Sequence, residues 1–240
     1  MTDVPVLQTY DLTMRFGGVV AVNHVDFALR EGELRCLIGP NGAGKSTFFK
    51  CLTGQLRPTE GRITVRDHDI TGAQSHEIAR LGIGIKTQVP NVFDGLTARE
   101  NIWLAARRGR SARAADALTD ETLERLLLTS VASAQVGQLA HGQRQWVELG
   151  VVLAREPWLI LLDEPAAGMT HEEVERTAAL IKEINRSATL IVVEHDMQFI
   201  KMIADVVTVF HQGAILVEDN VANVMRNPKV RDVYLGKQAA

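Results

Sequence analysis

The sequence predicts a single α/β domain, built on a mostly parallel sheet with an antiparallel β part at its N-terminal end and an inserted α-helical part. Three observations favour this class. Short apolar strands alternate with helical patterns, a glycine-rich loop joins one of these strands to a helix, and the pattern from Thr97 to about Ser133 is helical throughout. With 240 residues, 46% of them hydrophobic, the chain is long enough to bury one large core, or one core with a smaller lobe.

The first two predicted strands form an antiparallel unit. Residues 6 to 14 and 20 to 29 alternate loosely between apolar and polar, and Glu31-Gly32 then turns the chain into the next strand. Between the two runs, Phe16 stands beside the flexible pair Gly17-Gly18. An aromatic ring at such a turn either stacks on an adenine or fills the core, and the residues alone leave both open.

A phosphate-binding loop follows the apolar strand at residues 34 to 38. Residues 39–47 fit the pattern G-x-x-x-x-G-K-[ST], in which tightly folded glycines turn backbone NH groups toward phosphate oxygens. Lys45 is expected to reach the β and γ phosphates, and Ser46 to ligate Mg²⁺. A chance glycine-rich turn is disfavoured because Phe48, Phe49 and Leu52 supply the helix face that must come next. The predicted nucleotide-binding set is Gly39, Pro40, Asn41, Gly42, Ala43, Gly44, Lys45, Ser46 and Thr47.

The middle of the chain changes from mixed to helical. A strand at 63 to 65, a short helix at 75 to 81 and an apolar segment from Ile83 to Gln88 complete the first part of the core. A capping box, Thr97-x-x-Glu100, then opens the helical stretch, which continues with an amphipathic helix at 121 to 128. We therefore expect a helical subdomain at 89–149 inserted between core segments 1–88 and 150–240. The basic run at 107–113 is either a solvated face or a contact with a partner or acidic lipid.

An acidic pair ends the next buried strand. After a helical pattern through Leu153, the apolar segment 158 to 162 leads into Asp163-Glu164. Two carboxylates beside a strand end are costly to bury unless a cation is present, which disfavours a merely solvated turn. We expect Asp163 to hold Mg²⁺, directly or through water, and Glu164 to act as the general base toward the attacking water.

The strand-and-helix rhythm continues to the end. A helix at 171 to 186, capped by Thr170-x-x-Glu173, precedes a strand at 190 to 193, and His195 follows the carboxyl end of that strand. This histidine either senses a γ-phosphate at the sheet edge or is structural. A helix at 197 to 204, a hairpin pairing 206 to 210 with 214 to 217, and one short C-terminal helix complete the prediction.

Composition narrows the function classes. The net charge of −3 gives no general electrostatic reason to expect nucleic acid, and no apolar run approaches the roughly 18 to 20 residues that span a bilayer. The start of the chain has no secretory-signal pattern, so we expect a cytosolic protein. Cys36 and Cys51 show no metal-like spacing and are expected to be reduced, small apolar residues.

The chain resembles the ATP-binding subunit of an ABC transporter from about residue 5 to 236. Five motifs in order carry this resemblance: the phosphate loop, Gln88, the segment Leu139-Ala140-His141-Gly142-Gln143, the pair Asp163-Glu164, and His195. The resemblance implies that Phe16 stacks on adenine, that Gln88 senses Mg²⁺ and the attacking water, and that His195 is the switch histidine. It also implies that residues 139–143 are the signature segment, which caps the γ-phosphate on a partner. The active form is then a head-to-tail dimer with two ATP molecules between the subunits, and residues 166–170 form the loop that crosses between the sites.

The signature segment departs from the commonest family pattern, Leu-Ser-Gly-Gly-Gln. Ala140 replaces the serine whose hydroxyl contacts phosphate, and His141 replaces a glycine. The lost hydrogen bond is expected to weaken that half-site by about 1.5 to 3 kcal/mol unless His141 or backbone donors compensate. Such a segment is similar to those of the branched-chain amino acid and urea uptake group. Within that group, residues 31–39, 141–146, 167–170 and 193–197 look most like an ATPase of the urea importer.

The resemblance implies an ATP- and Mg²⁺-dependent ATPase at the cytoplasmic face of the inner membrane. Its partners are a second ATPase subunit, identical or related, membrane permease subunits and, indirectly, a solute-binding protein, with no nucleic acid. Urea is the expected solute, and branched-chain amino acids or short amides are the alternative. A soluble ABC ATPase of another class is disfavoured because the chain has neither two ATPase units nor a long coiled-coil insertion. A subunit that binds ATP without hydrolysing it is disfavoured by Glu164 and His195 and kept open by Ala140.

Overall fold

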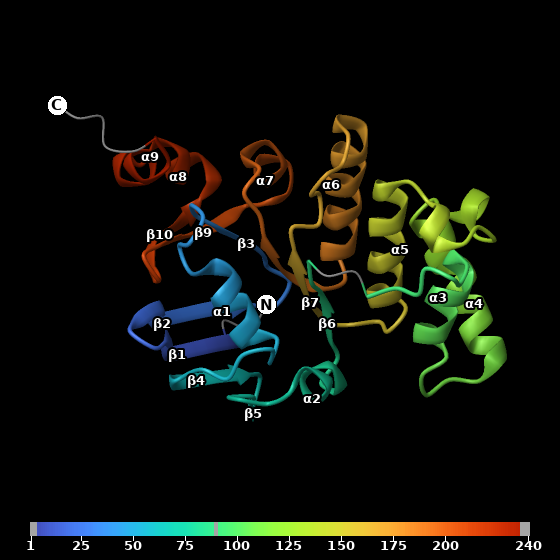
Figure 1. Ribbon diagram of the computed structural model, residues 1–240, viewed down its shortest axis with the longest axis horizontal. Coiled ribbons are helices and arrows are strands. Elements are labelled where there is room, and N and C mark those ends of the chain that lie inside the picture. The colour runs from blue at the N-terminus through green and yellow to red at the C-terminus, as the bar shows by residue number, and fades with distance from the viewer. Residues whose placement is uncertain (1–3, 89–90, 236–240) are drawn as a thin grey trace.

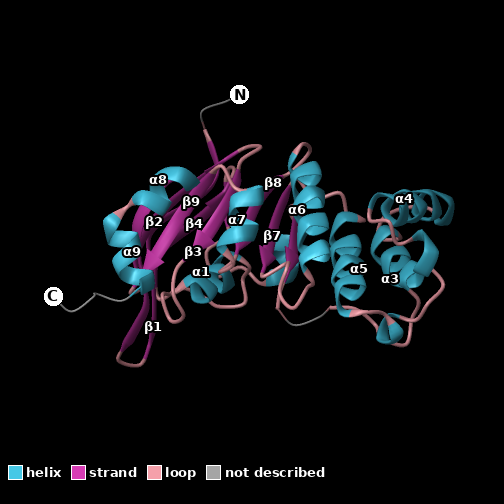
Figure 2. Ribbon diagram, turned by 90° about the horizontal axis from the view of Figure 1, so that it is seen from above, coloured by secondary structure: helices cyan, strands magenta, loops and turns pink. Residues whose placement is uncertain are grey.

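The computed structural model describes residues 4–88 and 91–235, with the side chain of Leu235 excepted. Figure 1 shows a six-stranded sheet in the middle of the molecule, with a smaller sheet and helix α1 on one side and helices α3, α4 and α5 gathered on the other. The view from above in Figure 2 shows α3 and α4 at one end of the molecule and α8 and α9 at the other, with the strands between them. The predicted α/β class, with an antiparallel β part and a helical part, is confirmed.

The smaller sheet is antiparallel and comes from the first third of the chain. Its strands are β1 (Pro5–Phe16), β2 (Val19–Arg30), β4 (Glu60–Val65) and the two-residue β5 (His68–Asp69), in the order β2-β1-β4-β5. Strands β1 and β2 form a long hairpin in which Phe16 pairs with Val19 at the tip. The expected antiparallel start is therefore correct, whereas β5 was not expected because two polar residues carry no strand signal.

The central sheet is parallel apart from one edge strand. It contains β3 (Leu34–Ile38), β6 (Ile83–Lys86), β7 (Leu159–Asp163), β8 (Thr189–Val193), β9 (Val206–His211) and β10 (Ala214–Asn220), in the order β10-β9-β3-β8-β7-β6. Every residue of β3, β7 and β8 is buried, as is typical of parallel strands covered on both faces. The edge strand β10 runs antiparallel, because it returns from β9 through the predicted hairpin.

Helices cover both faces of the central sheet. They are α1 (Lys45–Leu52), α2 (Ser75–Arg80), α6 (His171–Asn185), α7 (Met197–Ile203), α8 (Val221–Arg226) and α9 (Pro228–Leu235). Helix α6 begins with the predicted capping box, in which the amide of Glu173 donates to the Thr170 hydroxyl and the Glu173 carboxylate accepts from the Thr170 amide. The C-terminal region forms two short helices rather than the one expected, because Pro228 starts a new helix after Asn227.

The helical part comprises α3 (Ala98–Ala106), α4 (Ala112–Arg125), α5 (His141–Leu153) and two single-turn 3₁₀ helices at Thr129–Val131 and Val136–Gln138. Its buried side chains, among them Ile102, Leu123 and Val147, belong to the same apolar cluster as the side chains on one face of the central sheet. The helical part therefore shares its core with the sheet, and α5 is the element that connects the two. None of the helices in the described part of the chain is long and apolar enough to cross a membrane.

Candidate nucleotide-binding and catalytic site

Four sequence-predicted segments meet at the carboxyl edge of the central sheet. The strands β3, β8, β7 and β6 are neighbours in that order and run parallel. The phosphate loop follows β3, and His195 comes two residues after β8. The pair Asp163-Glu164 stands at the end of β7, and Gln88 comes two residues after β6. Ligands of open parallel sheets bind at this edge, so the topology brings together groups that lie far apart in the sequence.

The phosphate loop needs glycine at two positions for two reasons. Gly39 and Gly44 have φ angles of 147° and 103°, which side chains of other residues rarely adopt. A Cβ atom at Gly39 would also clash with the carbonyl oxygen of Phe210, and one at Gly44 with the carbonyl oxygen of Ala21. The loop is therefore packed between β9 and β2, and its conformation is fixed by the fold rather than by its own sequence alone.

Lys45 points back into this loop. Its ammonium donates to the carbonyl oxygens of Gly39, at 2.5 Å, and Pro40, at 3.1 Å, and the residue is buried. Burial lowers the pKa of Lys45, and the carboxylates of Glu164 and Asp163 act against that shift. The cation is thus already placed where phosphate oxygens would replace the two carbonyls as its partners. Ser46 follows on the first turn of α1 and is exposed, so its hydroxyl is available to a ligand.

Asp163 is a buried carboxylate that lacks a partner on one oxygen. It is 5% exposed, and its Oδ1 atom has no hydrogen-bond partner in the described part of the chain. Burial, with the neighbouring charge of Glu164, raises the pKa of Asp163 from its ordinary 3.8 to about 6. An unpaired carboxylate oxygen in a dry position is unfavourable unless a cation binds there, which fits the oxygen ligands that Mg²⁺ prefers.

The metal ligands would be completed by other groups. Among the residues that the structure describes, no three His, Cys, Asp or Glu side chains converge to hold a metal ion. A cation at Asp163 would therefore need the Ser46 hydroxyl, the Gln88 amide and phosphate oxygens of the nucleotide, which is how Mg²⁺ is usually held in nucleotide sites.

Glu164 has an unusual backbone that aims its side chain. Its φ angle is 47°, uncommon for a residue with a side chain, and its amide donates to the carbonyl oxygen of Val193 at 2.9 Å. The turn places its Oε1 atom 3.2 Å from Nδ1 of His195, which comes from the neighbouring strand. Strain of this kind persists where the surrounding structure fixes it and gathers at functional sites.

Sequence reasoning missed Glu194, which supports His195. Its carboxylate is 2% exposed and accepts hydrogen bonds from the amides of His195, at 2.8 Å, and Asp196, at 3.3 Å. Burial raises the pKa of Glu194, and these hydrogen bonds oppose the shift. The signal available in the sequence was a carboxylate directly after an apolar strand, the same signal that identified Asp163.

Phe16 and Gln88 are both exposed, at different corners of the fold. The Phe16 ring is 47% exposed at the tip of the β1–β2 hairpin, so the core-filling alternative is wrong. Gln88 lies two residues beyond the end of β6, whose Lys86 pairs with Leu162 just before Asp163. Gln88 therefore follows the strand next to the one that ends at Asp163, and its side chain is exposed.

The predicted signature segment, residues 139–143, forms the start of α5 and contacts a loop of its own chain. The Nε2 atom of His141 lies 2.9 Å from the carbonyl oxygen of Ala167, and the Glu173 carboxylate lies against Gly142. Ala140 is the N-cap residue and offers no side-chain acceptor, although its amide donates to Oε1 of Gln143 at 3.3 Å. Within the described residues, no recorded hydrogen bond joins this segment to the phosphate loop.

Sequence reasoning also missed two ion pairs on α5. Lys86 and Glu148 are each 5% exposed and lie 3.5 Å apart, while Arg144 binds Asp94 at 2.7 Å. The sequence shows that Arg144 and Glu148 are four residues apart on a helix, but this spacing does not predict which residues of another element pair with them.

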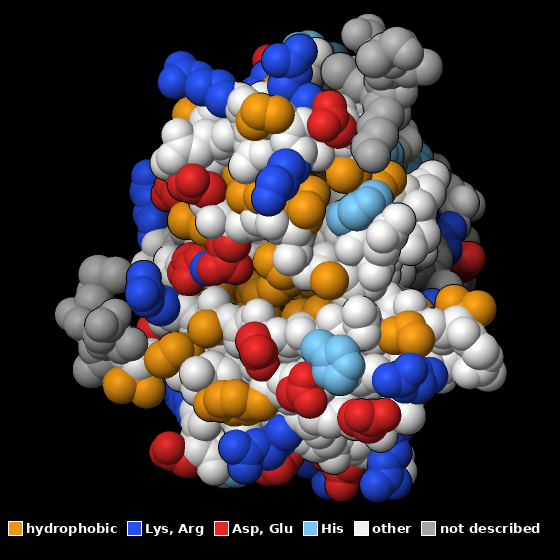
Figure 3. All heavy atoms as spheres, turned by 90° about the vertical axis from the view of Figure 1, so that its left-hand side faces the viewer, with side chains coloured by type: hydrophobic (Ala, Val, Ile, Leu, Met, Phe, Trp, Pro, Cys, Tyr) orange, Lys and Arg blue, Asp and Glu red, His pale blue; other side chains and the backbone are white. Residues whose placement is uncertain are grey.

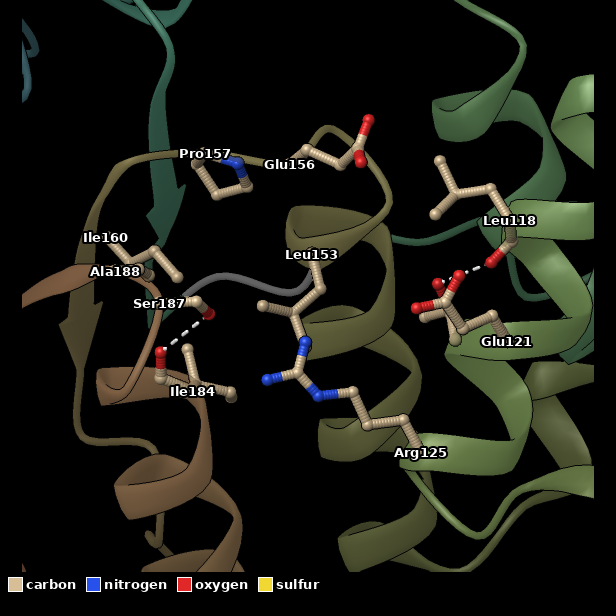
Figure 4. Close-up of a pocket in the computed structure, with 11 residues that line it drawn as sticks. Leu118, Glu121, Arg125, Leu153, Glu156, Pro157, Ile160, Ile184, Ser187 and Ala188 are labelled. Carbon is tan, nitrogen blue, oxygen red and sulfur yellow. Dashed lines mark hydrogen bonds between the residues drawn. The ribbon is translucent and has the colours of Figure 1, made fainter.

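The cavity in Figure 4, about 230 Å³, is not part of this site. It lies at the amino ends of β7 and β8, between α4, α5 and α6, whereas the predicted catalytic residues lie at the carboxyl ends of these strands. The guanidinium of Arg125 points into it but is paired with Glu183 at 2.7 Å, and Glu156 at its rim is paired with Arg110. The cavity therefore lies where the helical part packs against the central sheet and α6.

The chain is similar in sequence to known proteins. A family model described as ABC transporter matches residues 22–167. The high-affinity branched-chain amino acid transport ATP-binding protein BraF of Pseudomonas aeruginosa is 37% identical, covering 97% of this chain and 98% of that protein. The corresponding LivG protein of Salmonella typhimurium is 36% identical, again covering 97% and 98%.

Two solved structures have the same fold. A nucleotide-free ATP-binding cassette from an ABC transporter superimposes with a TM-score of 0.87 at 27% identity, covering 98% of this chain and all of that one. A dimeric ATP-binding cassette in a post-hydrolysis state, bound to ADP and phosphate, gives a TM-score of 0.80 at 26% identity, covering 90% and 98%.

Proposed function

This chain belongs to the ABC transporter family as an ATP-binding, transport-coupled ATPase subunit of an importer, and we propose that the solute it energises is a branched-chain amino acid. The relatives BraF and LivG, matched over nearly their whole length, are named for that transport. Urea, which the local segments at 141–146 and 193–197 favour, finds no support among these relatives and is the second candidate.

The hydrolytic step that we propose uses residues of all four neighbouring strands. Lys45 and the phosphate-loop amides bind the β and γ phosphates and neutralise charge that develops on them. Glu164 accepts a proton from water as the water oxygen bonds to the γ phosphorus and the bond to the ADP oxygen breaks. His195 orients the Glu164 carboxylate, and Gln88 orients the water. Ser46, Gln88 and Asp163 are the proposed Mg²⁺ ligands, and the ion would supply charge neutralisation between the phosphates. Phe16 is proposed to stack on adenine.

The single observation that carries this mechanism is the Glu164–His195 contact at 3.2 Å, beside a buried carboxylate with a free oxygen at Asp163. A subunit that merely binds ATP has no need for a base held in a strained turn. The retained base and histidine therefore support hydrolysis over the degenerate alternative.

The signature segment supports a dimer. Its helix N-terminus is suited to an anion, yet among the described residues His141 and Gly142 lie against residues 167 and 173, and no hydrogen bond joins the segment to the phosphate loop. We propose that residues 139–143 cap the nucleotide of a second ATPase subunit in head-to-tail fashion, the partner being either another copy or a related subunit. The solved dimeric cassette bound to ADP and phosphate is a precedent for such an assembly.

Contact with permease subunits is proposed around Gln88 and the helical part. Phe93, which follows Gln88 in the chain, is 64% exposed, and Leu104 on α3 is 47% exposed. Large apolar side chains exposed on the helical part and on the chain that leads into it are suited to a protein partner. This contact would place the subunit at the cytoplasmic face of the inner membrane, with only indirect dependence on a solute-binding protein.

The soluble, nucleic-acid-linked alternative has less support. On the side of the molecule that Figure 3 shows, basic and acidic side chains are interspersed, without a large region of one sign. Together with the net charge of −3, this offers no broad electrostatic footprint for a polyanion.

ATP hydrolysis by the purified chain tests the proposal, first alone and then with membranes carrying the transport proteins encoded beside it. Leucine and urea are each presented on the matching solute-binding protein. Stimulation by leucine supports the proposed solute, stimulation by urea replaces it with the second candidate, and turnover indifferent to membranes and solutes points to the soluble ATPase.

A further inference from the structure

We propose that helix α5 clamps the chain on both sides of Gln88 through the ion pairs Lys86–Glu148 and Asp94–Arg144, so that Lys86, Asp94, Arg144 and Glu148 are positioning residues for Gln88. The inference rests on the proposed role of Gln88 in hydrolysis. It adds a physical link between Gln88 and the signature segment, because α5 begins at that segment.

The first half of the clamp lies at the end of β6. The Lys86 ammonium is 3.5 Å from Oε2 of Glu148, and each side chain is only 5% exposed. Asp163 and Glu194 also act on the charge of Lys86, although Glu148 is its ion-pair partner. Gln88 follows two residues later, which leaves its backbone little freedom to move independently of this pair.

The second half of the clamp holds the chain beyond Gln88. The Arg144 guanidinium is 2.7 Å from Oδ1 of Asp94. Asp94 is also fixed by its backbone, because the amide of Gly137 donates to its carbonyl oxygen at 3.0 Å. Gly137 is packed so closely that an added Cβ would lie 3.3 Å from the Cβ of Asp94. Asp94 is thus tied both to α5 and to the turn that leads into it.

The two pairs are complementary in register as well as in sign. Arg144 and Glu148 are four residues apart, so they lie on one face of α5, about 6 Å apart along its axis. Lys86 and Asp94 offer the opposite charges in the matching order. Displacement of α5 by one turn would place like charges together, so the arrangement specifies one position of α5 relative to Gln88.

Stability alone does not account for this cluster. A buried ion pair is often no more stabilising than well-packed apolar side chains of similar size. Here Oε1 of Glu148 and Nε of Arg144 are buried without a hydrogen-bond partner in the described part of the chain, which adds to the cost. A cluster with unmet hydrogen bonds between the catalytic edge and the signature helix fits a device that fixes position.

Charge exchange across the more exposed pair tests the clamp. The variants are Asp94→Lys, Arg144→Glu and the double variant with both changes, and Asp94→Asn serves as the milder single change. The matched control exchanges Arg99 and Asp120, an ion pair 2.5 Å apart that joins α3 to α4 inside the helical part, with similar exposure. Hydrogen exchange of nucleotide-free protein is followed in peptides covering 83–88 and 139–146, beside ATP binding and hydrolysis.

We expect each single change to speed exchange in the 83–88 peptide by at least about fivefold and to slow hydrolysis by about tenfold or more, with ATP affinity nearly unchanged. The double variant should restore both readouts to within about threefold of the original protein, and the control exchange should move neither. Single variants that leave exchange at 83–88 unchanged, or a double variant no better than the singles, would overturn the clamp. Hydrogen exchange is measured without nucleotide, so it tests the clamp independently of hydrolysis. A chain that never hydrolyses ATP would refute the proposed function, and the exchange results would still show whether the ion pairs position residues 83–88.

Discussion

The Nδ1 atom of His195 lies 3.2 Å from Oε1 of Glu164, although the two residues are 31 positions apart in the sequence. The contact exists because β7 and β8 are neighbours whose carboxyl ends meet, with Asp163 paired with Val193. The left-handed turn at Glu164 then directs the carboxylate toward the histidine. This geometry supports the proposed roles of Glu164 as a base and of His195 as its orienting group, a common pattern for activating a nucleophile.

Replacing Glu164 by Gln should abolish turnover without abolishing nucleotide binding. The amide keeps the shape of the side chain but does not accept the proton of the attacking water, so we expect hydrolysis to fall by about 10² to 10⁴-fold. Bound ATP should then accumulate with a dimeric form, visible by size-exclusion chromatography with radiolabelled ATP. Normal steady turnover by this variant would refute the base assignment.

His195→Ala should also lower hydrolysis, but through the position of Glu164 rather than through proton transfer. We expect a loss of about tenfold to a hundredfold, since misplacing a reacting group by an ångström has effects of that order. The distinguishing result is a double variant with Glu164→Gln that is no slower than Glu164→Gln alone. Additive losses would instead show that His195 acts separately from Glu164.

Local patterns predicted the fold well because most of its elements carry their own signals. The buried strands β3, β7 and β8 are short apolar runs, and α3 and α6 begin with capping boxes that appear in the structure as expected. The failures have physical reasons. Strand β5 is two polar residues that pair only because β4 is beside them. The C-terminal region, expected to be one helix, forms two because Pro228 begins a new helix.

For the candidate site, the sequence indicated the groups with recognisable local chemistry and missed those defined by distant contacts. Asp163 and Lys45 stand in motifs, whereas Lys86 and Glu148 become a pair only when β6 packs against α5. Glu194 is similar, because its role depends on amides that fold back over it. Periodicity reports which face of an element is buried, but not which charged side chain of another element faces it.

Lys45→Ala should weaken ATP binding strongly. The ammonium has two carbonyl partners in the phosphate loop at 2.5 and 3.1 Å, and with ATP present it would bind phosphate oxygens instead. Loss of a charge-assisted contact of this kind corresponds to about 1.5 to 3 kcal/mol, or about tenfold to more than a hundredfold in affinity. Titration with a fluorescent ATP analogue measures it. Lys50→Ala, an exposed lysine on the same helix, is the control and should leave affinity within about twofold.

Ala140→Ser should strengthen the start of α5. Ala140 is the N-cap residue without a side-chain acceptor, and a serine hydroxyl there typically adds about 1 kcal/mol to helix stability. We expect a higher free energy of unfolding in urea and, with Glu164→Gln, a dimer that forms at lower ATP concentration. A rise in stability with no change in dimer formation would show that residue 140 does not face the partner's phosphate.

Asp163→Asn should stabilise the protein in a pH-dependent way when neither metal nor nucleotide is present. The pKa of Asp163 is raised to about 6 in the folded state, chiefly by burial, against an ordinary value of 3.8. Between these values the folded state binds more protons than the unfolded state, so stability falls as the pH rises through this window. The neutral amide lacks this loss, and the variant should exceed the original protein by up to about 3 kcal/mol above pH 6, with the difference fading toward pH 4.

Urea unfolding at pH 4.5 and 7.5, in buffer with a chelator, measures this difference. Asp69→Asn is the matched control because hydrogen bonds from Thr71 lower the pKa of Asp69, so its charged form is favoured by folding. That variant should be destabilised rather than stabilised, and more so at the higher pH. Adding Mg²⁺ with ATP should then reverse the order for Asp163, because the cation binds the charged carboxylate and stabilises only the original protein. An Asp163→Asn variant whose advantage is the same at both pH values would show that the unpaired oxygen, rather than the charge, sets the cost of burying this carboxylate.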